Sequence, residues 1–166
     1  MQIRLAQLTD ADKILNIIEI NKMYLKNKNI DQWQNGYPNI NSIHNDINLK
    51  QCFVLEENDE IIGTAAIITG IEETYNTIYN GKWLTDIDNY VTIHRIAISP
   101  NYKGRNLAYK FIEYCVDNYS KCTSIRIDTH KDNLSMQKFL VNSGFTNCGD
   151  IYLEDGNHRY GYELTF

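Results

Sequence analysis

Apolar residues recur at two spacings along the chain, and these spacings separate predicted strands from predicted helices. Short runs that are β-branched, or that alternate with polar residues, predict strands over residues 2–6, 52–57, 60–69, 91–98, 124–129, 146–153 and 159–166. Apolar residues three and four apart predict helices over residues 14–25, 40–47, 107–116 and 133–140. Strands that alternate with helices predict an α/β fold (α+β in some schemes), with a twisted mixed sheet of about six or seven strands and helices on both faces.

Residues 70–90 fit neither spacing and are expected to form a helical insert plus a strand edge. No Ser/Gly/Pro-rich linker and no internal repeat interrupts the chain. A length of 166 residues lies within the usual range of ~100–200 residues for one domain. Residues 1–166 are therefore expected to form a single domain.

A small cationic turn follows the predicted strand 91–98. Ser99-Pro100-Asn101 ends that strand, because proline has no amide for the ladder, and Lys103-Gly104-Arg105-Asn106 then opens a helix. The first amides of a helix lack internal partners, and the helix dipole favours an anion there. With two cations beside those amides, the turn predicts a phosphate site. The alternative is an ordinary strand-turn-helix with a solvated basic turn.

The same turn resembles the motif Arg/Gln-x-x-Gly-x-Gly/Ala of the GNAT superfamily of acyl-CoA-dependent N-acetyltransferases. Lys103 stands at the Arg/Gln position, and Asn106 stands at the first Gly position of the motif. Lysine keeps the charge and loses the planar fork of arginine. Asparagine tolerates a positive φ best among the residues other than glycine, so Asn106 is expected to be left-handed.

A second run resembles the other GNAT signature, Asn-x-x-Ala-x-x-Leu-Tyr-x-x-x-Gly-Phe. Asn133, Gly144 and Phe145 match this signature, whereas Met136, Phe139 and Leu140 depart from it. Leu140 stands where the family often has a tyrosine that protonates the leaving thiolate. The two signatures cover about residues 91–145 in the expected order, and the pair is more specific than either signature alone.

The resemblance implies an N-acetyltransferase that moves an acetyl group from acetyl-CoA to a primary amine by direct attack in a ternary complex. The implied cofactor-binding residues are Ile96, Ala97 and Ile98 along the pantetheine arm, Lys103, Gly104, Arg105, Asn106, Leu107 and Ala108 around the pyrophosphate, and Asn133, Met136 and Phe139 on the following helix. An acyl-CoA-binding regulatory module with little or no turnover is the alternative.

An attacking amine must lose a proton, so the transfer needs a base. The candidates are His94, near the start of the central strand, and Asp128 and His130, at the end of the next strand. If those strands are neighbours, the three side chains converge on one cleft. Histidine suits the task because its pKa lies near neutrality.

Two large aromatic residues, Trp33 and Tyr37, occupy a turn-rich loop. They are expected either to cap the edge of the core or to line an acceptor pocket, and the resemblance supports the pocket. Tyr152 is a third candidate for this pocket. The acceptor is expected to be a small-molecule amine or a peptide amine, and the net charge of −5 favours a cationic small molecule.

Composition narrows the remaining classes of function. An acidic balance without a long Lys/Arg run argues against a nucleic-acid partner. No apolar run reaches the ~18 residues of a membrane span. No signal-peptide core is visible at the start of the chain, so a cytoplasmic protein is expected. A homodimer is compatible with the sequence.

The cysteine and histidine spacings predict no metal site. The four cysteines show no C-x-x-C and the four histidines show no H-E-x-x-H. Reduced structural thiols are expected. A cysteine nucleophile, such as Cys52 or Cys148, is a rival hypothesis that no motif supports.

Overall fold

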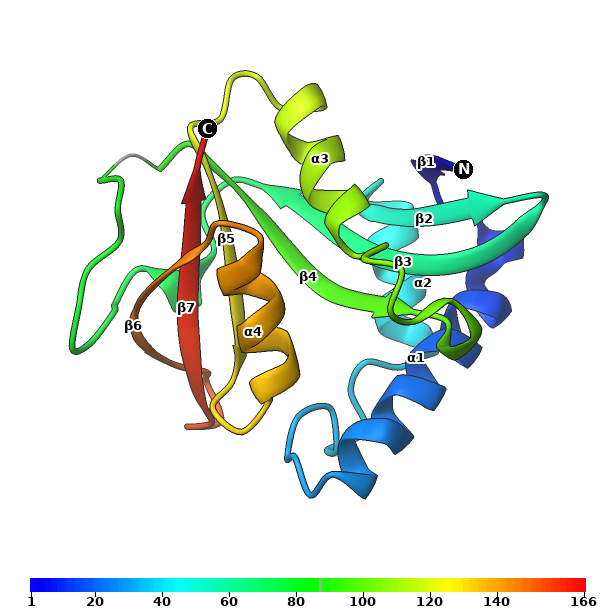
Figure 1. Cartoon of the computed structure of the whole chain (residues 1–166), viewed down its shortest axis with the longest axis horizontal. Helices are drawn as coiled ribbons and strands as arrows, with labels where there is room; N and C mark the ends of the chain where they lie inside the picture. Colours follow the sequence, from blue (N-terminus) through cyan, green and yellow to red (C-terminus); the bar gives the residue numbers. More distant parts are fainter. Residues whose placement is uncertain (87) are drawn as a thin grey trace. The chain divides into compact units, whose positions relative to one another are not determined.

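The strands of the protein form one mixed sheet. The computed structural model describes residues 1–86 and 88–166. Within these residues, seven strands follow the order β1-β2-β3-β4-β5-β7-β6 (Figure 1). The strands are β1 (Gln2–Leu5), β2 (Cys52–Glu57), β3 (Glu60–Thr69), β4 (Tyr90–Ile98), β5 (Ser124–His130), β6 (Thr146–Tyr152) and β7 (His158–Thr165). The prediction of a mixed sheet is confirmed.

Four α-helices connect the strands of the described residues. They are α1 (Ala11–Asn27), α2 (Ile40–Asn48), α3 (Tyr109–Asn118) and α4 (Leu134–Asn142). In that part of the chain, no helix is long and apolar enough to cross a membrane.

The chain divides into two compact units. The N-terminal unit contains Met1–Ile67 and His94–Tyr114, and the C-terminal unit contains Ile68–Ile93 and Cys115–Phe166.

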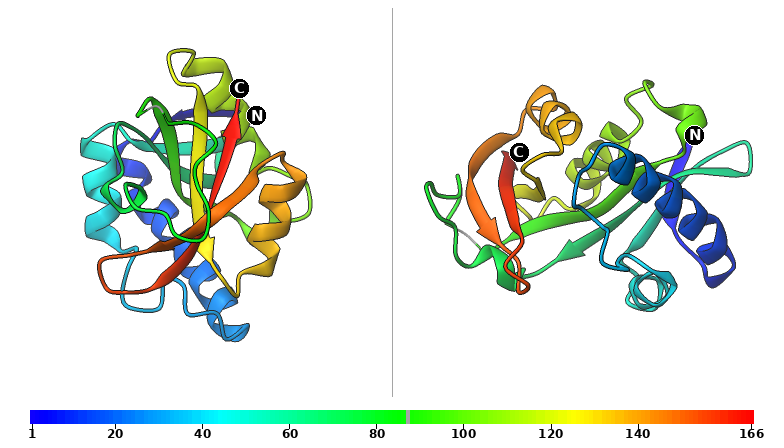
Figure 2. Two further views of the ribbon diagram at one scale, coloured as in Figure 1. Left: turned by 90° about the vertical axis from the view of Figure 1, so that its left-hand side faces the viewer. Right: turned by 90° about the horizontal axis from the view of Figure 1, so that it is seen from below.

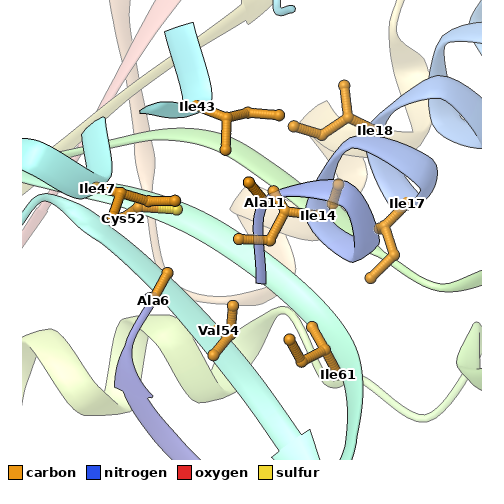
Figure 3. Close-up of a cluster of buried hydrophobic side chains, with 11 residues drawn as sticks. Ala6, Ala11, Ile14, Ile17, Ile18, Ile43, Ile47, Cys52, Val54 and Ile61 are labelled. Atoms are coloured by element: carbon orange, nitrogen blue, oxygen red, sulfur yellow. The ribbon is translucent and has the colours of Figure 1, made fainter. Parts of the chain in front are cut away.

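The N-terminal unit is built around a cluster of isoleucines. The predicted helical spacing places apolar residues of α1 and α2 on the sides that face β2 and β3, as Figure 3 shows. The buried members are Ala6, Ala11, Ile14, Ile17, Ile18, Ile43, Ile47, Cys52, Val54, Ile61 and Ala97. Phe53 alternates with Cys52 and Val54 along β2, and its ring instead contacts Tyr114 of α3 at 5.3 Å. Helices therefore cover both faces of this part of the sheet.

The β2–β3 hairpin forms as its sequence predicts. Asn58 and Asp59 have φ values of 50° and 62°, as the two-residue turn requires. Gly63 of β3 lies against the C-terminal end of β4. A Cβ at Gly63 would sit 2.7 Å from Ile98 Cδ1 and 3.3 Å from the Ala97 carbonyl oxygen. The backbones of β3 and β4 therefore approach each other closely at this glycine.

The C-terminal unit has an aromatic and ionic core. The guanidinium of Arg126 lies 4.0 Å from the ring centre of Tyr90 and 4.4 Å from that of Trp83. Its Nε is 3.0 Å from Glu163 Oε1, and both side chains are buried. Glu163 also accepts a hydrogen bond from the Thr85 hydroxyl at 2.6 Å. Strand β7 (red in Figure 2) pairs with β5 (yellow) on one side and with β6 (orange) on the other.

Two sequence predictions for helices are wrong. Among the described residues of 70–90, the helical structure is a 3-10 turn at Glu73–Tyr75, and residue 87 lies outside the described residues. The helix predicted from residue 107 begins as a regular helix at Tyr109. Val116, the last residue of the predicted range, is 37% exposed, whereas Phe111, Ile112 and Cys115 are buried.

Candidate functional site

The turn between β4 and α3 has the backbone geometry of an anion site. A 3-10 turn at Pro100–Tyr102 follows β4, and Gly104 then has a φ of 81°. Asn106 has a φ of 55°, which confirms the left-handed conformation expected from its sequence position. A Cβ at Gly104 would meet no atom within 4 Å, so space is open beside this turn.

The amides of this turn are available to a ligand. Within residues 1–86 and 88–166, none of the amides of residues 104–108 donates a backbone hydrogen bond. The first such bond of the following segment runs from Tyr109 N to Asn106 O at 3.1 Å. Consecutive unpaired amides that precede a helix form a concave donor site that suits a phosphate. The residues present therefore fit the pyrophosphate of a CoA ester.

Two cations flank these amides. Lys103 Nζ lies 4.1 Å from the centre of the Tyr24 ring, and burial lowers the pKa of Lys103. The side chain of Arg105 is 49% exposed and lies 3.4 Å from Glu57. Ion pairs at exposed sites contribute little to stability, so Arg105 can exchange its contact with Glu57 for another anion at little cost. The turn thus carries two positive charges close in sequence to the unpaired amides.

The end of β4 is anchored from α1. Asn21 Nδ2 donates to the Ile98 carbonyl at 3.1 Å and to the Ile17 carbonyl at 2.9 Å. Ala97 is 2% exposed, so the contribution of this segment to ligand binding has to come from its backbone. Sequence reasoning missed Asn21. Its signal was a polar residue within the apolar stripe of the predicted helix.

Arg95 is the second residue that sequence reasoning missed. It has a φ of 57° inside β4, a conformation that is rare for a residue with a long side chain. Its Nη2 lies 2.9 Å from Asp46 of α2, and its Nη1 donates to the Tyr37 hydroxyl. The guanidinium also lies 5.8 Å from the Tyr37 ring centre. No feature of the sequence distinguished Arg95 or Asp46.

His94 precedes Arg95 in β4 and is half-buried. Burial raises the pKa of Asp46, and Arg95 and His94 act on this pKa in the opposite direction. His94 is thus close enough to Asp46 to interact electrostatically with it.

The other two candidate bases lie in the C-terminal unit. Asp128 Oδ1 accepts a hydrogen bond from the Tyr75 hydroxyl at 2.7 Å, and its Oδ2 lies 3.7 Å from Arg159 Nε. His130 is 7% exposed, and its Nδ1 accepts from the Asp132 amide at 3.2 Å. The carboxylate of Asp132 lies 3.7 Å from the same nitrogen. Convergence of these residues with His94 stays a prediction.

The aromatic candidates differ in their surroundings. Trp33 packs against the isoleucine cluster of the N-terminal unit, which is the role expected for a cap on the core. Tyr37 is 41% exposed and contacts Arg95. Tyr152 lies in the C-terminal unit, is 50% exposed and has its ring 5.4 Å from that of His158. Their role toward an acceptor stays a prediction.

The residues of the second signature form the start and the buried side of α4. Asn133 is the N-cap, and its Oδ1 accepts from the Met136 amide at 3.2 Å. Met136 and Phe139 are half-buried. Leu140 has 0% exposure, so this position lies in the core. Gly144 follows the helix with a φ of 91°, the left-handed conformation that commonly ends a helix.

All four cysteines are free and buried. Burial raises the pKa of Cys52 to about 11 and that of Cys115 to about 12, and it also raises the pKa values of Cys122 and Cys148. A thiol with a raised pKa is a poor nucleophile, so a cysteine mechanism has no structural support. In the described part of the chain, no group of three or more His, Cys, Asp or Glu residues could hold a metal ion.

Comparison with solved structures gives relatives over the whole chain. A GNAT-family acetyltransferase from Streptococcus agalactiae 2603 is 38% identical, with a TM-score of 0.92, over 99% of this chain and 95% of its own. A ribosomal-protein-alanine N-acetyltransferase from Brucella melitensis is 13% identical, with a TM-score of 0.68, over 100% of both chains. The yncA protein of Salmonella typhimurium, solved with its cofactor acetyl-CoA, is 16% identical, with a TM-score of 0.66, over 99% of this chain and 93% of its own. The last two likenesses concern the fold alone.

The search of curated proteins finds no match. The model of the acetyltransferase (GNAT) family matches residues 17–145, which include the β4–α3 turn and both sequence signatures. This match spans most of the chain, and the Streptococcus agalactiae structure agrees with it over nearly all residues. The chain therefore belongs to the acetyltransferase (GNAT) family.

Proposed function

We propose that the protein transfers an acetyl group from acetyl-CoA to the primary amine of a small molecule or peptide. The observation that carries this proposal is the β4–α3 turn. Its amides at residues 104–108 are unpaired in the described chain, Asn106 is left-handed, and Lys103 and Arg105 stand beside them. Membership of an acetyltransferase family adds the acetyl chemistry.

The cofactor would be held by backbone groups more than by side chains. The unpaired amides of residues 104–108 would bind the pyrophosphate, and the backbone of residues 96–98 would bind the pantetheine arm. Asn133, Met136 and Phe139 would complete this site. Acetyl-CoA supplies a thioester whose acyl carbon the acceptor amine attacks. Holding both substrates together can supply up to ~7–11 kcal/mol of the barrier.

His94 is the proposed base. It would accept the proton of the attacking amine on its imidazole. Asp128 and His130 rank below His94, because Asp128 contacts Tyr75 and Arg159 and His130 accepts a hydrogen bond from the Asp132 amide.

Direct attack in a ternary complex is favoured over an acetyl-cysteine route, because every cysteine is buried. The family match extends across both compact units, which supports one N-acetyltransferase domain over residues 1–166. The Brucella melitensis relative is named for an alanine acceptor, so a peptide amine belongs in any test beside small amines.

A binding module without turnover is the second candidate, and one observation favours it. Leu140 is fully buried where the family often has a tyrosine, so α4 offers no phenol to protonate the thiolate at that position.

Turnover with an amine panel separates the two candidates. The panel contains spermidine, lysine amide and a peptide with an N-terminal alanine, each incubated with acetyl-CoA and analysed by mass spectrometry. An acetylated amine, with intersecting double-reciprocal plots and no acetylated protein, supports direct transfer. Binding of acetyl-CoA by calorimetry without acetylation of any amine supports the module.

A further inference from the structure

Two unfavourable features meet at Arg95. A residue with a long side chain has a φ of 57° inside a strand, and its Nε is buried without a hydrogen-bond partner in the described chain. Each feature is costly and persists only where the surrounding contacts require it. The contacts that Arg95 makes therefore indicate the structural role of this conformation.

Those contacts tie together three separate segments of the N-terminal unit. Arg95 belongs to β4, Asp46 to α2, and Tyr37 to the loop of residues 30–39 between α1 and α2. Both Asp46 oxygens lie 2.9 Å from Arg95 Nη2, and the side chains of the pair are 12% and 9% exposed. The Arg95–Asp46 ion pair is largely removed from water, so it holds the guanidinium of Arg95 in place.

The loop side of the arrangement is more exposed. Tyr37 has 41% exposure, accepts a hydrogen bond from Arg95 Nη1 and places its ring 5.8 Å from the guanidinium. The planar fork of arginine can serve Asp46 and Tyr37 at once, which a lysine ammonium cannot do with the same geometry. One side chain thus fixes the loop relative to the strand that carries His94.

We propose that Arg95 is a positioning residue for the acceptor: its guanidinium, held by Asp46, fixes Tyr37 and the loop of residues 30–39 beside His94. This inference rests on the proposed transfer to an amine, and it goes beyond that proposal by assigning acceptor affinity to Arg95 and Asp46. Arg95 acts through Tyr37 and the loop, so its loss raises the KM of the acceptor and leaves acetyl-CoA binding in place.

Three variants separate the side chain from the backbone. Arg95→Gln removes the charge and keeps the strained φ, whereas Arg95→Gly removes the side chain and accepts the positive φ without strain. Tyr37→Phe removes the hydroxyl and keeps the ring. Arg4→Gln is the matched control, because the guanidinium of Arg4 likewise contacts two side chains of the N-terminal unit, Asp10 at 2.8 Å and Glu56 at 2.9 Å.

The experiment combines three measurements on the full chain. These are the KM of the panel amine with the highest turnover, the Kd of acetyl-CoA by calorimetry, and hydrogen–deuterium exchange of residues 30–39. In both Arg95 variants we expect the amine KM to rise by about tenfold or more, the acetyl-CoA Kd to stay within about twofold, and exchange of the loop to increase. Tyr37→Phe should give a smaller shift in the same direction, and Arg4→Gln should leave the amine KM and loop exchange unchanged.

An unchanged amine KM or an unchanged loop exchange in both Arg95 variants overturns the inference. Equal effects in Arg4→Gln also overturn it, because they would show a general loss of stability. If the wild-type protein acetylates no panel amine, the proposed function has failed. In that case the exchange measurement still decides whether Arg95 holds the loop.

Discussion

Tyr75 donates a hydrogen bond to Asp128, with 2.7 Å between the hydroxyl oxygen and Oδ1. Tyr75 is fully buried, and burial raises the pKa of its phenol well above the usual value, so the hydroxyl remains a donor at neutral pH. Arg159 lies near the other carboxylate oxygen of Asp128. Asp128 is thus part of the internal structure of the C-terminal unit, which leaves His94 as the stronger candidate for the base.

The first prediction compares these two residues. His94→Gln cannot accept a proton and should lower kcat by ~10²–10⁴, the usual contribution of a general base. Asp128→Asn can still accept the Tyr75 hydrogen bond through its amide oxygen, so its kcat should fall far less. Steady-state kinetics with saturating acetyl-CoA measure both values. A larger loss in Asp128→Asn than in His94→Gln would assign the base to Asp128.

The second prediction concerns the charges of the β4–α3 turn. Lys103→Glu combined with Arg105→Glu should abolish acetyl-CoA binding in calorimetry, because both substitutions place an anion beside the phosphate site. The control is Lys13→Glu combined with Lys50→Glu, which changes the net charge equally at two exposed sites. If the control loses as much affinity as the turn variant, the effect comes from net charge and the turn does not bind the cofactor.

The third prediction uses the left-handed backbone of Asn106. Asn106→Gly should bind acetyl-CoA with the affinity of the wild type, because glycine adopts a φ of 55° without strain. Asn106→Val should bind at least about tenfold more weakly, since a β-branched residue disfavours this conformation. Equal dissociation constants for the two variants would show that the backbone conformation at Asn106 does not matter for binding.

The fourth prediction tests the close approach at Gly63. A Cβ at this position would lie 2.7 Å from Ile98 Cδ1 and 3.3 Å from the Ala97 carbonyl oxygen. Gly63→Ala should therefore displace the end of β4, lower the free energy of unfolding by ~1–3 kcal/mol and weaken acetyl-CoA binding. Adding Ile98→Val removes the Cδ1 atom and should restore part of both quantities. No recovery in the double variant would mean that Ala97, and not Ile98, resists the new methyl group.

The fifth prediction is a dependence of stability on pH. The hydrogen bond from Arg4 lowers the pKa of Asp10 in the folded protein, against the opposing effect of burial. The unfolded chain therefore takes up this proton first as the pH falls. The stabilisation is present above the unfolded pKa of ~3.9 and is lost as the pH falls through the lower folded value. Asp10→Asn should flatten the loss of unfolding free energy below about pH 4 in urea titrations. A profile as steep as that of the wild type would assign acid sensitivity to other carboxylates.

The sequence pattern predicted the parts of the fold that depend on residues close together in the chain. The β2–β3 hairpin follows from two mainly apolar runs and the Asn58-Asp59 turn, and its strands have the predicted bounds. Residues 70–90 could not be predicted, because side chains distant in sequence hold them. Glu163 accepts hydrogen bonds from the Leu84 amide and the Thr85 hydroxyl, and Arg126 stacks on Trp83.

In the candidate site too, features formed by neighbouring residues could be predicted, and features formed by residues distant in sequence could not. The turn at Lys103–Ala108 was visible because glycine, asparagine and cations follow a strand within a few residues. Arg95 and Asp46 were not visible, because their relationship spans 49 positions and involves a φ that the residue type does not suggest. Leu140 was read as a missing acid, and the structure adds that its position is fully buried.

The burial of the four thiols has a consequence for following the reaction. Release of CoA produces a small, fully solvated thiol, whereas Cys52, Cys115, Cys122 and Cys148 lie inside the folded chain. An aromatic disulfide such as Ellman's reagent will react with the free CoA while the folded chain contributes almost no colour. Absorbance can thus report each turnover continuously in native protein, and a sudden additional rise equivalent to four thiols per chain would signal unfolding in the same cuvette.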